Sequence, residues 1–216
     1  MTRPVTEVAF ADLLPDAIVA ESLAAIETIL YRQEGIRRIW WGFFPEDRTK
    51  IMFIGNWDDI TCHWSFEQSE SSYPAVSAIL AGILAGPVQK FHVHLDQDTL
   101  CRVLEAPAVE VYIITCVSEN FQSNAQHIVS VGCSAHQSRG FVHGPVVEKI
   151  GHRPGDTVGS AHFAAVAWDS LNFRTSASVL ETEMYFRTKA EAVKIHHAPP
   201  YQRHWARSMQ NPEMGA

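Results

Sequence analysis

One order of predicted elements occurs twice in this chain, and this repeat limits the folds that the chain can adopt. A strand that passes through a tryptophan and an aspartate into a helix is predicted at Asn56-Trp57-Asp58-Asp59-Ile60 and again at Ala167-Trp168-Asp169-Ser170-Leu171. Phe91-His92-Val93-His94 has a looser counterpart in Lys194-Ile195-His196-His197. Self-similar segments in the same order indicate an internal duplication. We therefore expect one small unit that is folded twice along the chain.

The first half predicts the order β-α-β-β-α-β. Alternating apolar residues indicate strands, apolar residues at helical spacing indicate helices, and turn-forming residues after Phe44 indicate a hairpin. Asp58 or Asp59 is placed to cap the second helix, which Tyr73-Pro74 interrupts. The predicted elements are a strand, a helix, two strands, a helix and a strand, at residues 5–11, 16–34, 37–44, 50–57, 58–85 and 88–95.

The second half predicts the same order from Glu105 onward. Its elements are a strand, a helix, two strands, a helix and a strand, at residues 109–117, 118–135, 141–150, 162–168, 169–190 and 193–198. We therefore expect two α+β domains, residues 1–100 and 101–201, followed by a C-terminal tail at 202–216.

Charge and composition exclude several classes of function. The chain has 17 Lys and Arg residues and 24 Asp and Glu residues, which gives a net charge of −7. Its basic residues form only short pairs. Nucleic acid and anionic membranes are therefore poor partners. No apolar stretch is long enough to cross a bilayer, and the first residues do not resemble a signal peptide, so we expect a cytoplasmic protein. The four cysteines lie far apart, which favours buried free thiols. Nucleophile elbows, phosphate-binding loops and dinucleotide fingerprints do not occur in the sequence, so we expect neither a metal nor another cofactor.

The element order and the two strand-Trp-Asp-helix junctions resemble the dimeric α+β barrel superfamily, and within it the antibiotic-biosynthesis-monooxygenase-like (ABM-like) proteins of fungi. The resemblance covers the chain to about Tyr201. It implies tandem ferredoxin-like units with antiparallel sheets that form a barrel within one molecule or pair as a homodimer. It also implies a ligand pocket for an apolar small molecule.

Two histidines on the last strand of the first half are the first catalytic candidates. Phe91, Val93 and Leu95 share one strand face, which leaves His92 and His94 on the other face. Imidazoles at this spacing can transfer protons, hold a metal, or have a purely structural role. A cupin metal motif also begins at Gly86, but the predicted helices contradict a cupin fold because cupins are nearly all strand.

His63 and Tyr73 are the other catalytic candidates, on the second helix and the segment after it. In the branch of the family that resembles olivetolic acid cyclase, a tyrosine and a histidine in this region carry out acid-base cyclisation. Counting from Trp57, the tyrosine of that branch falls on Phe66, and the expected histidine does not follow. His63 and Tyr73 are then expected to act from other positions, with ordinary core or surface roles as the alternative.

Aromatic residues concentrate in the first hairpin and the following helix. Adjacent Trp40 and Trp41 must point to opposite faces of their strand, so one of them is available to line a cavity for a flat apolar ligand. The predicted substrate-binding residues are Trp40, Trp41, Phe43, Phe53, Trp64 and Phe66.

The second half has its own candidates for a second pocket or the relic of one. Glu110 and Tyr112 share a strand face, and His143 and His162 lie in the second predicted hairpin. For the whole chain we expect a cofactor-independent enzyme of secondary metabolism, a cyclase, isomerase or decarboxylase that uses acid-base histidines in a hydrophobic pocket. The alternatives are a cofactor-free oxygenase of the ABM type and a non-catalytic ligand carrier.

Overall fold

The computed structural model describes residues 3–44, 47–115, 121, 124–127, 130, 138–148, 160–169 and 192–196. These residues form two compact units, which divide between Lys90 and Phe91. The division falls inside a strand, ten residues before the expected domain boundary at residue 100, so the predicted boundary stays a prediction.

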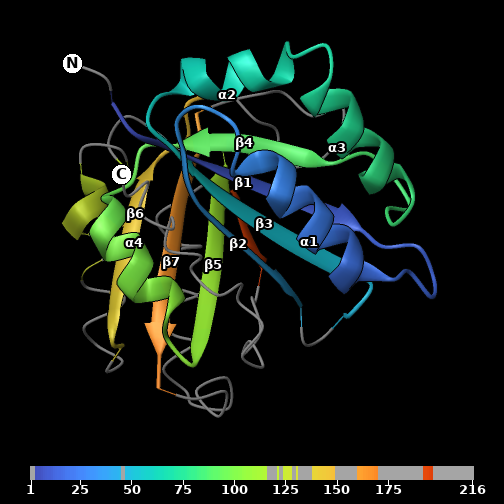
Figure 1. The fold of residues 1–216 in the computed structure, drawn as a ribbon. Helices are drawn as coiled ribbons and strands as arrows, with labels where there is room; N and C mark the ends of the chain where they lie inside the picture. Colours follow the sequence, from blue (N-terminus) through green and yellow to red (C-terminus); the bar gives the residue numbers. More distant parts are fainter. Residues whose placement is uncertain are drawn as a thin grey trace, which may run out of the picture. The chain divides into compact units, whose positions relative to one another are not determined.

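The first unit has the predicted β-α-β-β-α-β order, with its second helix in two pieces (Figure 1). Its four-stranded sheet has the order β2-β3-β1-β4, and the central strand β3 pairs antiparallel with both β1 and β2. The elements are β1 (Val5–Asp12), α1 (Val19–Leu30), β2 (Ile36–Phe43), β3 (Lys50–Trp57), α2 (Ile60–Glu67), α3 (Ser72–Ala81) and β4 (Gln89–Val93).

Helices α1, α2 and α3 cover one face of this sheet. In the β1–β3 and β2–β3 ladders, Glu7 lies opposite Gly55 and Trp41 lies opposite Phe53, so these four residues share that face. Leu23 and Ile26 of α1 are buried in the core between the helices and the sheet. Burial of this apolar surface, at about 25 cal/mol per Å², is the main force that holds the helices on the sheet.

Local chemistry sets where the helices begin. The Asp59 side chain accepts a hydrogen bond from the Thr61 amide at 2.9 Å and caps α2, as predicted. Helix α1 begins at Val19, later than predicted, because Asp16 adopts a left-handed conformation with φ of 60°. Helix α3 already begins at Ser72, since Pro74 falls within its first turn, where proline is tolerated.

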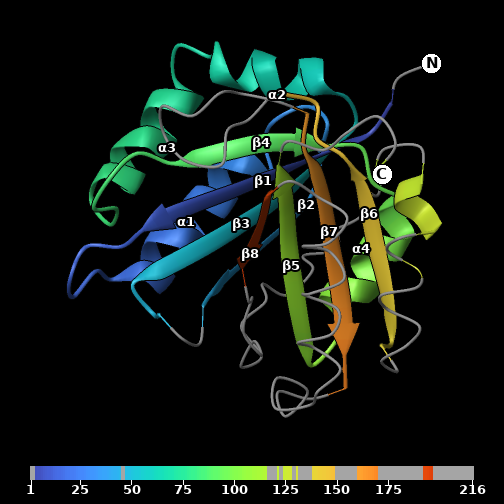
Figure 2. The same ribbon diagram turned by 180° about the vertical axis from the view of Figure 1, so that it is seen from behind.

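The second unit has a sheet of the same topology, shown from behind in Figure 2. Its strand order β6-β7-β5-β8 repeats β2-β3-β1-β4 position by position, and its central strand β7 pairs antiparallel with both β5 and β6. The elements are α4 (Gln97–Leu104), β5 (Ala108–Thr115), β6 (Gly140–Pro145), β7 (His162–Trp168) and β8 (Ala192–His196). The predicted α+β class with antiparallel ferredoxin-like sheets is therefore confirmed.

The helices of the second half differ from the prediction at one point. Helix α4 was not predicted, although the Asp96 side chain caps it by accepting a hydrogen bond from the Thr99 amide at 2.8 Å. A helix was predicted over residues 118–135, and every described residue of this segment, from Phe121 to Ser130, is helical. The helix predicted over 169–190 lies outside the described residues. Across the described part of the chain, helices long and apolar enough to cross a membrane do not occur.

Candidate active site

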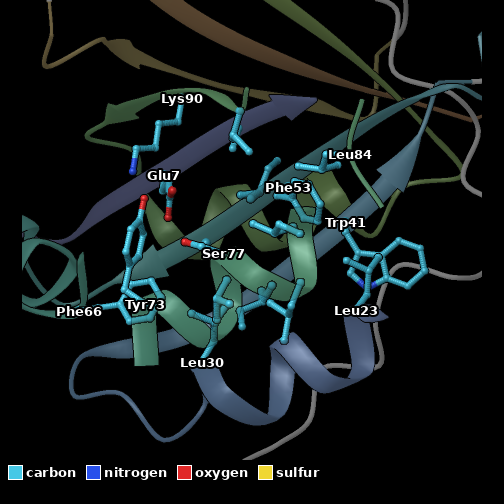
Figure 3. A pocket seen from close by; sticks show the side chains of 18 of the residues that line it. Glu7, Leu23, Leu30, Trp41, Phe53, Phe66, Tyr73, Ser77, Leu84 and Lys90 are labelled. Carbon is cyan, nitrogen blue, oxygen red and sulfur yellow. The ribbon is translucent and has the colours of Figure 1, made fainter. Parts of the chain in front are cut away.

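A pocket of about 600 Å³ lies between the helices and the sheet of the first unit (Figure 3). Its size falls within the range of small-molecule sites, and its walls are mainly aliphatic and aromatic. Strands β1, β2, β3 and β4 and helices α1, α2 and α3 all contribute lining residues. The apolar walls include Leu23, Leu30, Trp41, Phe53, Phe66 and Leu84.

Ionisable side chains gather at one end of the pocket. Figure 3 shows Glu7, Tyr73 and Lys90 close together there, while Trp41 and Leu23 lie at the other end. The His63 Nε2 atom is 3.2 Å from Glu7 Oε2 and 3.9 Å from Glu67 Oε1. The Lys90 ammonium pairs with Glu67 and lies 5.8 Å from the centre of the Tyr73 ring. We call Glu7, His63, Glu67, Tyr73 and Lys90 the acid-base cluster.

Four separate elements bring the acid-base cluster together. Glu7 comes from β1, His63 and Glu67 lie one helical turn apart on α2, Tyr73 comes from α3, and Lys90 comes from β4. The cap at Asp59 fixes where α2 begins and therefore turns His63 inward, where its side chain is only 2% exposed. The indole Nε1 of Trp57, at the end of β3, donates to Glu7 Oε2 at 3.4 Å, so Trp57 and His63 both contact the Glu7 carboxylate.

The carboxylates of the cluster stabilise the charge of Lys90. Burial alone would lower the pKa of Lys90, but its hydrogen bond to Glu67 and the nearby Glu7 and Glu67 carboxylates outweigh burial and raise that pKa. Lys90 therefore stays protonated at neutral pH. Two carboxylates, one ammonium group and the His63 imidazole therefore share this end of the pocket.

A second carboxyl group lines the pocket on helix α1. The Trp41 indole Nε1 donates a hydrogen bond to Glu27 Oε1 at 3.0 Å. Burial raises the pKa of Glu27, and the hydrogen bond from Trp41 opposes this shift without cancelling it. The pocket thus has a polar group beside Trp41 in addition to the acid-base cluster.

The chain has the fold of known proteins over nearly its whole length. No protein-family model and no curated protein sequence matches it. Among solved structures, an anthrone oxidase-like protein is similar over 95% of this chain and 97% of its own, with a TM-score of 0.55 and 12% identity. A candidate monooxygenase from Fusobacterium nucleatum matches 93% of this chain and 97% of its own, with a TM-score of 0.54 and 9% identity. A candidate monooxygenase from Lactobacillus acidophilus matches 92% and 97%, with a TM-score of 0.54 and 10% identity. At such low identity, these likenesses show a common fold.

The structure brings several of the predicted site residues into the pocket. Its lining includes the predicted catalytic residues His63 and Tyr73 and the predicted substrate-binding residues Trp41, Phe53 and Phe66. Their roles in catalysis and binding stay predictions, but they now share one cavity. The pair Trp40 and Trp41 separates as expected, with Trp41 facing the pocket.

Three predicted binding residues lie outside the pocket lining. Trp40 is buried on the opposite face of β2, because neighbouring strand residues alternate. Phe43 lies on the same face of β2 as Trp41 and packs edge-on against it, with 5.8 Å between ring centres. Trp64 faces outward from α2 and is 47% exposed.

His92 and His94 also lie outside the pocket lining. Both belong to the second unit, where His92 Nδ1 contacts the Glu148 carboxylate and the His92 amide donates to Glu148 Oε2 at 2.8 Å. The His92 carbonyl accepts a hydrogen bond from the Val147 amide at 2.8 Å, which ties this strand to the end of β6. These contacts favour the structural alternative for His92.

Sequence reasoning missed Glu7, Glu27, Glu67 and Lys90. For Glu7 a signal existed, because the alternation of β1 places this carboxylate on the same face as Val5, Ala9 and Ala11. A lone charge on an apolar strand face is expensive to bury and indicates a site. For Lys90 and Glu67 the sequence offers no such signal. In the described part of the chain, groups of three or more His, Cys, Asp or Glu side chains arranged to hold a metal do not occur.

Proposed function

We propose that the first unit is the catalytic unit of a cofactor-independent oxygenase. Its substrate is a flat, largely apolar small molecule that loses a proton to form a stabilised carbanion. The observation that carries this proposal is an apolar pocket at one end of which two carboxylates, an imidazole and an ammonium group lie close together. The walls suit a fused aromatic ring system, since Trp41, Phe53 and Phe66 supply broad apolar surface.

Glu7 is the group we assign as the base. Its side chain is 21% exposed and lies in the pocket, whereas His63 is 2% exposed with its Nε2 directed at Glu7. His63 is therefore a positioning residue, which donates to the Glu7 carboxylate and fixes its orientation. Lys90 lies at the same end of the pocket and offers a positive charge to the oxygen on which the negative charge of the carbanion accumulates.

The reaction balances without an external electron donor. Removal of one proton from a substrate CH₂ group gives a carbanion, which reduces O₂ and combines with it to form a C–OOH group. Loss of water from that CH–OOH group leaves a ketone, so one CH₂ and one O₂ give one C=O and one H₂O. The protein contributes a base and an apolar cavity that orients the substrate.

The fold comparisons support oxygen chemistry over the other proton-transfer reactions. Three solved structures that share the fold across more than nine-tenths of the chain are named as candidate monooxygenases or as anthrone oxidase-like. A cyclase or isomerase would begin with the same deprotonation, so dependence on O₂ separates the two classes. A ligand carrier would bind the same molecules without turnover.

Oxygen uptake with anthrone as the probe tests the proposal. We expect the protein without added cofactor to consume one O₂ for each anthrone and to form anthraquinone, as followed with an oxygen electrode and by absorbance. Under nitrogen the reaction should stop. Turnover of anthrone that continues under nitrogen would assign a proton-transfer enzyme instead, and binding without any turnover would assign a carrier.

Substitution of the base tests the assignment of the site. Glu7→Gln keeps the size of the side chain and removes the proton acceptor, so we expect kcat to fall by about 10²-fold or more. Glu70→Gln makes the same change at an exposed residue outside the pocket and should leave kcat unchanged. A Glu7→Gln protein that is as active as the Glu70→Gln control would remove Glu7 from the mechanism.

A further inference from the structure

The two sheets correspond residue by residue. Trp57 lies opposite Val5 in the first sheet, and Trp168 lies opposite Ala108 in the second. Two residues further along the partner strands, Glu7 lies opposite Gly55 and Glu110 lies opposite Val166. Glu110 of the second unit therefore occupies the strand position of Glu7 in the first.

The corresponding sheet face of the second unit is polar where the first is apolar. Trp41 in β2, which lies opposite Phe53, corresponds to His143 in β6, which lies opposite Ala164. By the same alignment, Ile51 corresponds to His162 and Ala9 to Tyr112. The buried Tyr112 hydroxyl donates to Glu110 Oε2. Burial of ionisable groups lowers the stability of a fold, and such groups concentrate at functional sites. Their concentration on one sheet face therefore indicates a site.

The hydrogen bonds of the two histidines have a direction. Gln126 Oε1 lies 2.7 Å from His143 Nε2, so His143 carries its proton on Nε2 and donates to this oxygen. His143 Nδ1 is then an acceptor, and it lies 2.9 Å from His162 Nε2, which must donate. A neutral His162 with its proton on Nε2 presents a bare lone pair on Nδ1. Among the described residues, this buried Nδ1 atom has no hydrogen-bond partner.

His162 stays neutral over the whole physiological range. Burial, reinforced by the neighbouring His143, lowers the pKa of His162 to about 3, and burial also lowers the pKa of His143. His162 is 3% exposed, so water reaches it poorly. A buried acceptor without a donor costs free energy that a bound donor recovers.

We propose that the second unit holds a separate binding site in which His162 Nδ1 accepts a hydrogen bond from a phenolic or enolic hydroxyl group of a small neutral ligand. The surrounding rings favour an aromatic ligand, since Phe121 meets His162 edge-on at 5.6 Å and Phe141 stacks on His143 at 6.0 Å. This site is independent of the function proposed for the first unit, because none of its residues belongs to the first pocket.

The protonation state of the free protein is the first test. In protein labelled with ¹⁵N-histidine, two-bond ¹H–¹⁵N spectra distinguish a protonated ring nitrogen from a bare one. We expect His162 to show a bare Nδ1 and a protonated Nε2 at pH 7. A protonated Nδ1 would reverse the direction of the hydrogen bonds and overturn the proposal, whatever ligand is tried.

Titration with phenol and anisole is the second test, because the two rings have similar shapes and only phenol can donate. We expect phenol to shift the His162 Nδ1 resonance saturably, and anisole to bind about tenfold more weakly without that shift. Equal binding of both probes, or a resonance that phenol does not move, would contradict the proposal.

Variants complete the test. His162→Asn should weaken phenol binding about tenfold, whereas His127→Asn, the same change at an exposed histidine, should leave it unchanged. Circular dichroism checks that each variant is folded. If His162→Asn does not fold, the phenol and anisole titrations of the unaltered protein still decide the outcome.

Discussion

At the scale of the residue, one carboxylate on a strand determines what the first pocket can do. Glu7 lies on an otherwise apolar face of β1, between the Nε2 atom of His63 and the Nε1 atom of Trp57. Both neighbours offer N–H groups to the carboxylate, and donors of this kind favour its ionised form. The chemistry of the pocket therefore depends on the neighbours of Glu7 as much as on Glu7 itself.

The first residue-scale prediction concerns His63. His63→Phe removes the donor at Nε2, so the Glu7 carboxylate becomes easier to protonate and the acidic limb of the kcat/KM profile moves to higher pH. We also expect kcat at neutral pH to fall by about tenfold. The pH dependence of anthrone-driven oxygen uptake measures both effects. Ser65→Ala, at an exposed position on the same helix, serves as the control. If His63→Phe has the same pH profile of kcat/KM as this control, His63 does not position Glu7.

The second residue-scale prediction concerns Glu27. Its pKa is raised by burial, so its contribution to stability is present below the ordinary carboxyl pKa and is lost as the pH rises through the raised value. Glu27→Gln can still accept the hydrogen bond from Trp41 and does not titrate. We expect the variant to gain stability relative to the unaltered protein between pH 4 and pH 8, as measured by urea denaturation. A difference that stays constant with pH would contradict this expectation.

At the scale of the element, close backbone approach fixes how β6 lies in the second unit. A Cβ atom added to Gly144 would lie 2.3 Å from the carbonyl oxygen of His94 and 3.2 Å from Val93 Cγ1. The Val147 amide donates to the His92 carbonyl just beyond this point. Only glycine allows the chain after β4 to run this close to β6.

Gly144→Ala tests this close approach. The methyl group must displace backbone, so we expect the free energy of unfolding of the second unit to fall by about 1–3 kcal/mol. Gly86→Ala is a matched control, because a Cβ atom there would meet nothing within 4 Å. Hydrogen exchange of the β5 and β7 amides measures the loss. Equal protection in the two variants would show that β6 has room to move away.

At the scale of the whole molecule, one topology is used twice with different chemistry. Both sheets place their elements in the same order, yet the first sheet faces its pocket with Trp41 and Phe53 where the second has His143 and Ala164. The two units therefore differ in how they respond to acid. Homodimer formation and a cytoplasmic location stay predictions of the sequence.

The whole-molecule prediction is that acid destabilises the second unit through His162. The pKa of this residue is about 3 in the folded unit and about 6.5 in an unfolded chain, so below pH 6.5 the unfolded chain binds a proton that the folded unit does not. The free energy of unfolding should fall by up to about 3 kcal/mol between pH 7 and pH 4.5. Hydrogen exchange at the two pH values measures the fall, and His162→Asn should flatten it. An equally steep fall in that variant would point to other groups.

Local sequence patterns were enough to predict most of the elements and their order. Alternation and turn residues predicted β1, β2, β3 and β7 within one residue and the start of β6, which ends earlier than predicted. The cap at Asp58 or Asp59 and the opposite orientations of the two tryptophans of β2 were predicted as well. These features depend on short stretches of chain, where the period of the side chains and local hydrogen bonds decide the outcome. The short helix α4 was missed, although its cap at Asp96 was available as a signal.

Which of these residues meet depends on how the elements pack together. Glu7, His63 and Lys90 come from β1, α2 and β4, and their distances follow from the packing of helices on the sheet. In the second unit, His92 meets Glu148, which lies 56 residues further along the chain. In the first unit, Trp64 lies at the surface. Periodicity tells which face of its own element a side chain occupies. Which faces pack together depends on contacts between segments far apart in the chain, and no local pattern encodes them.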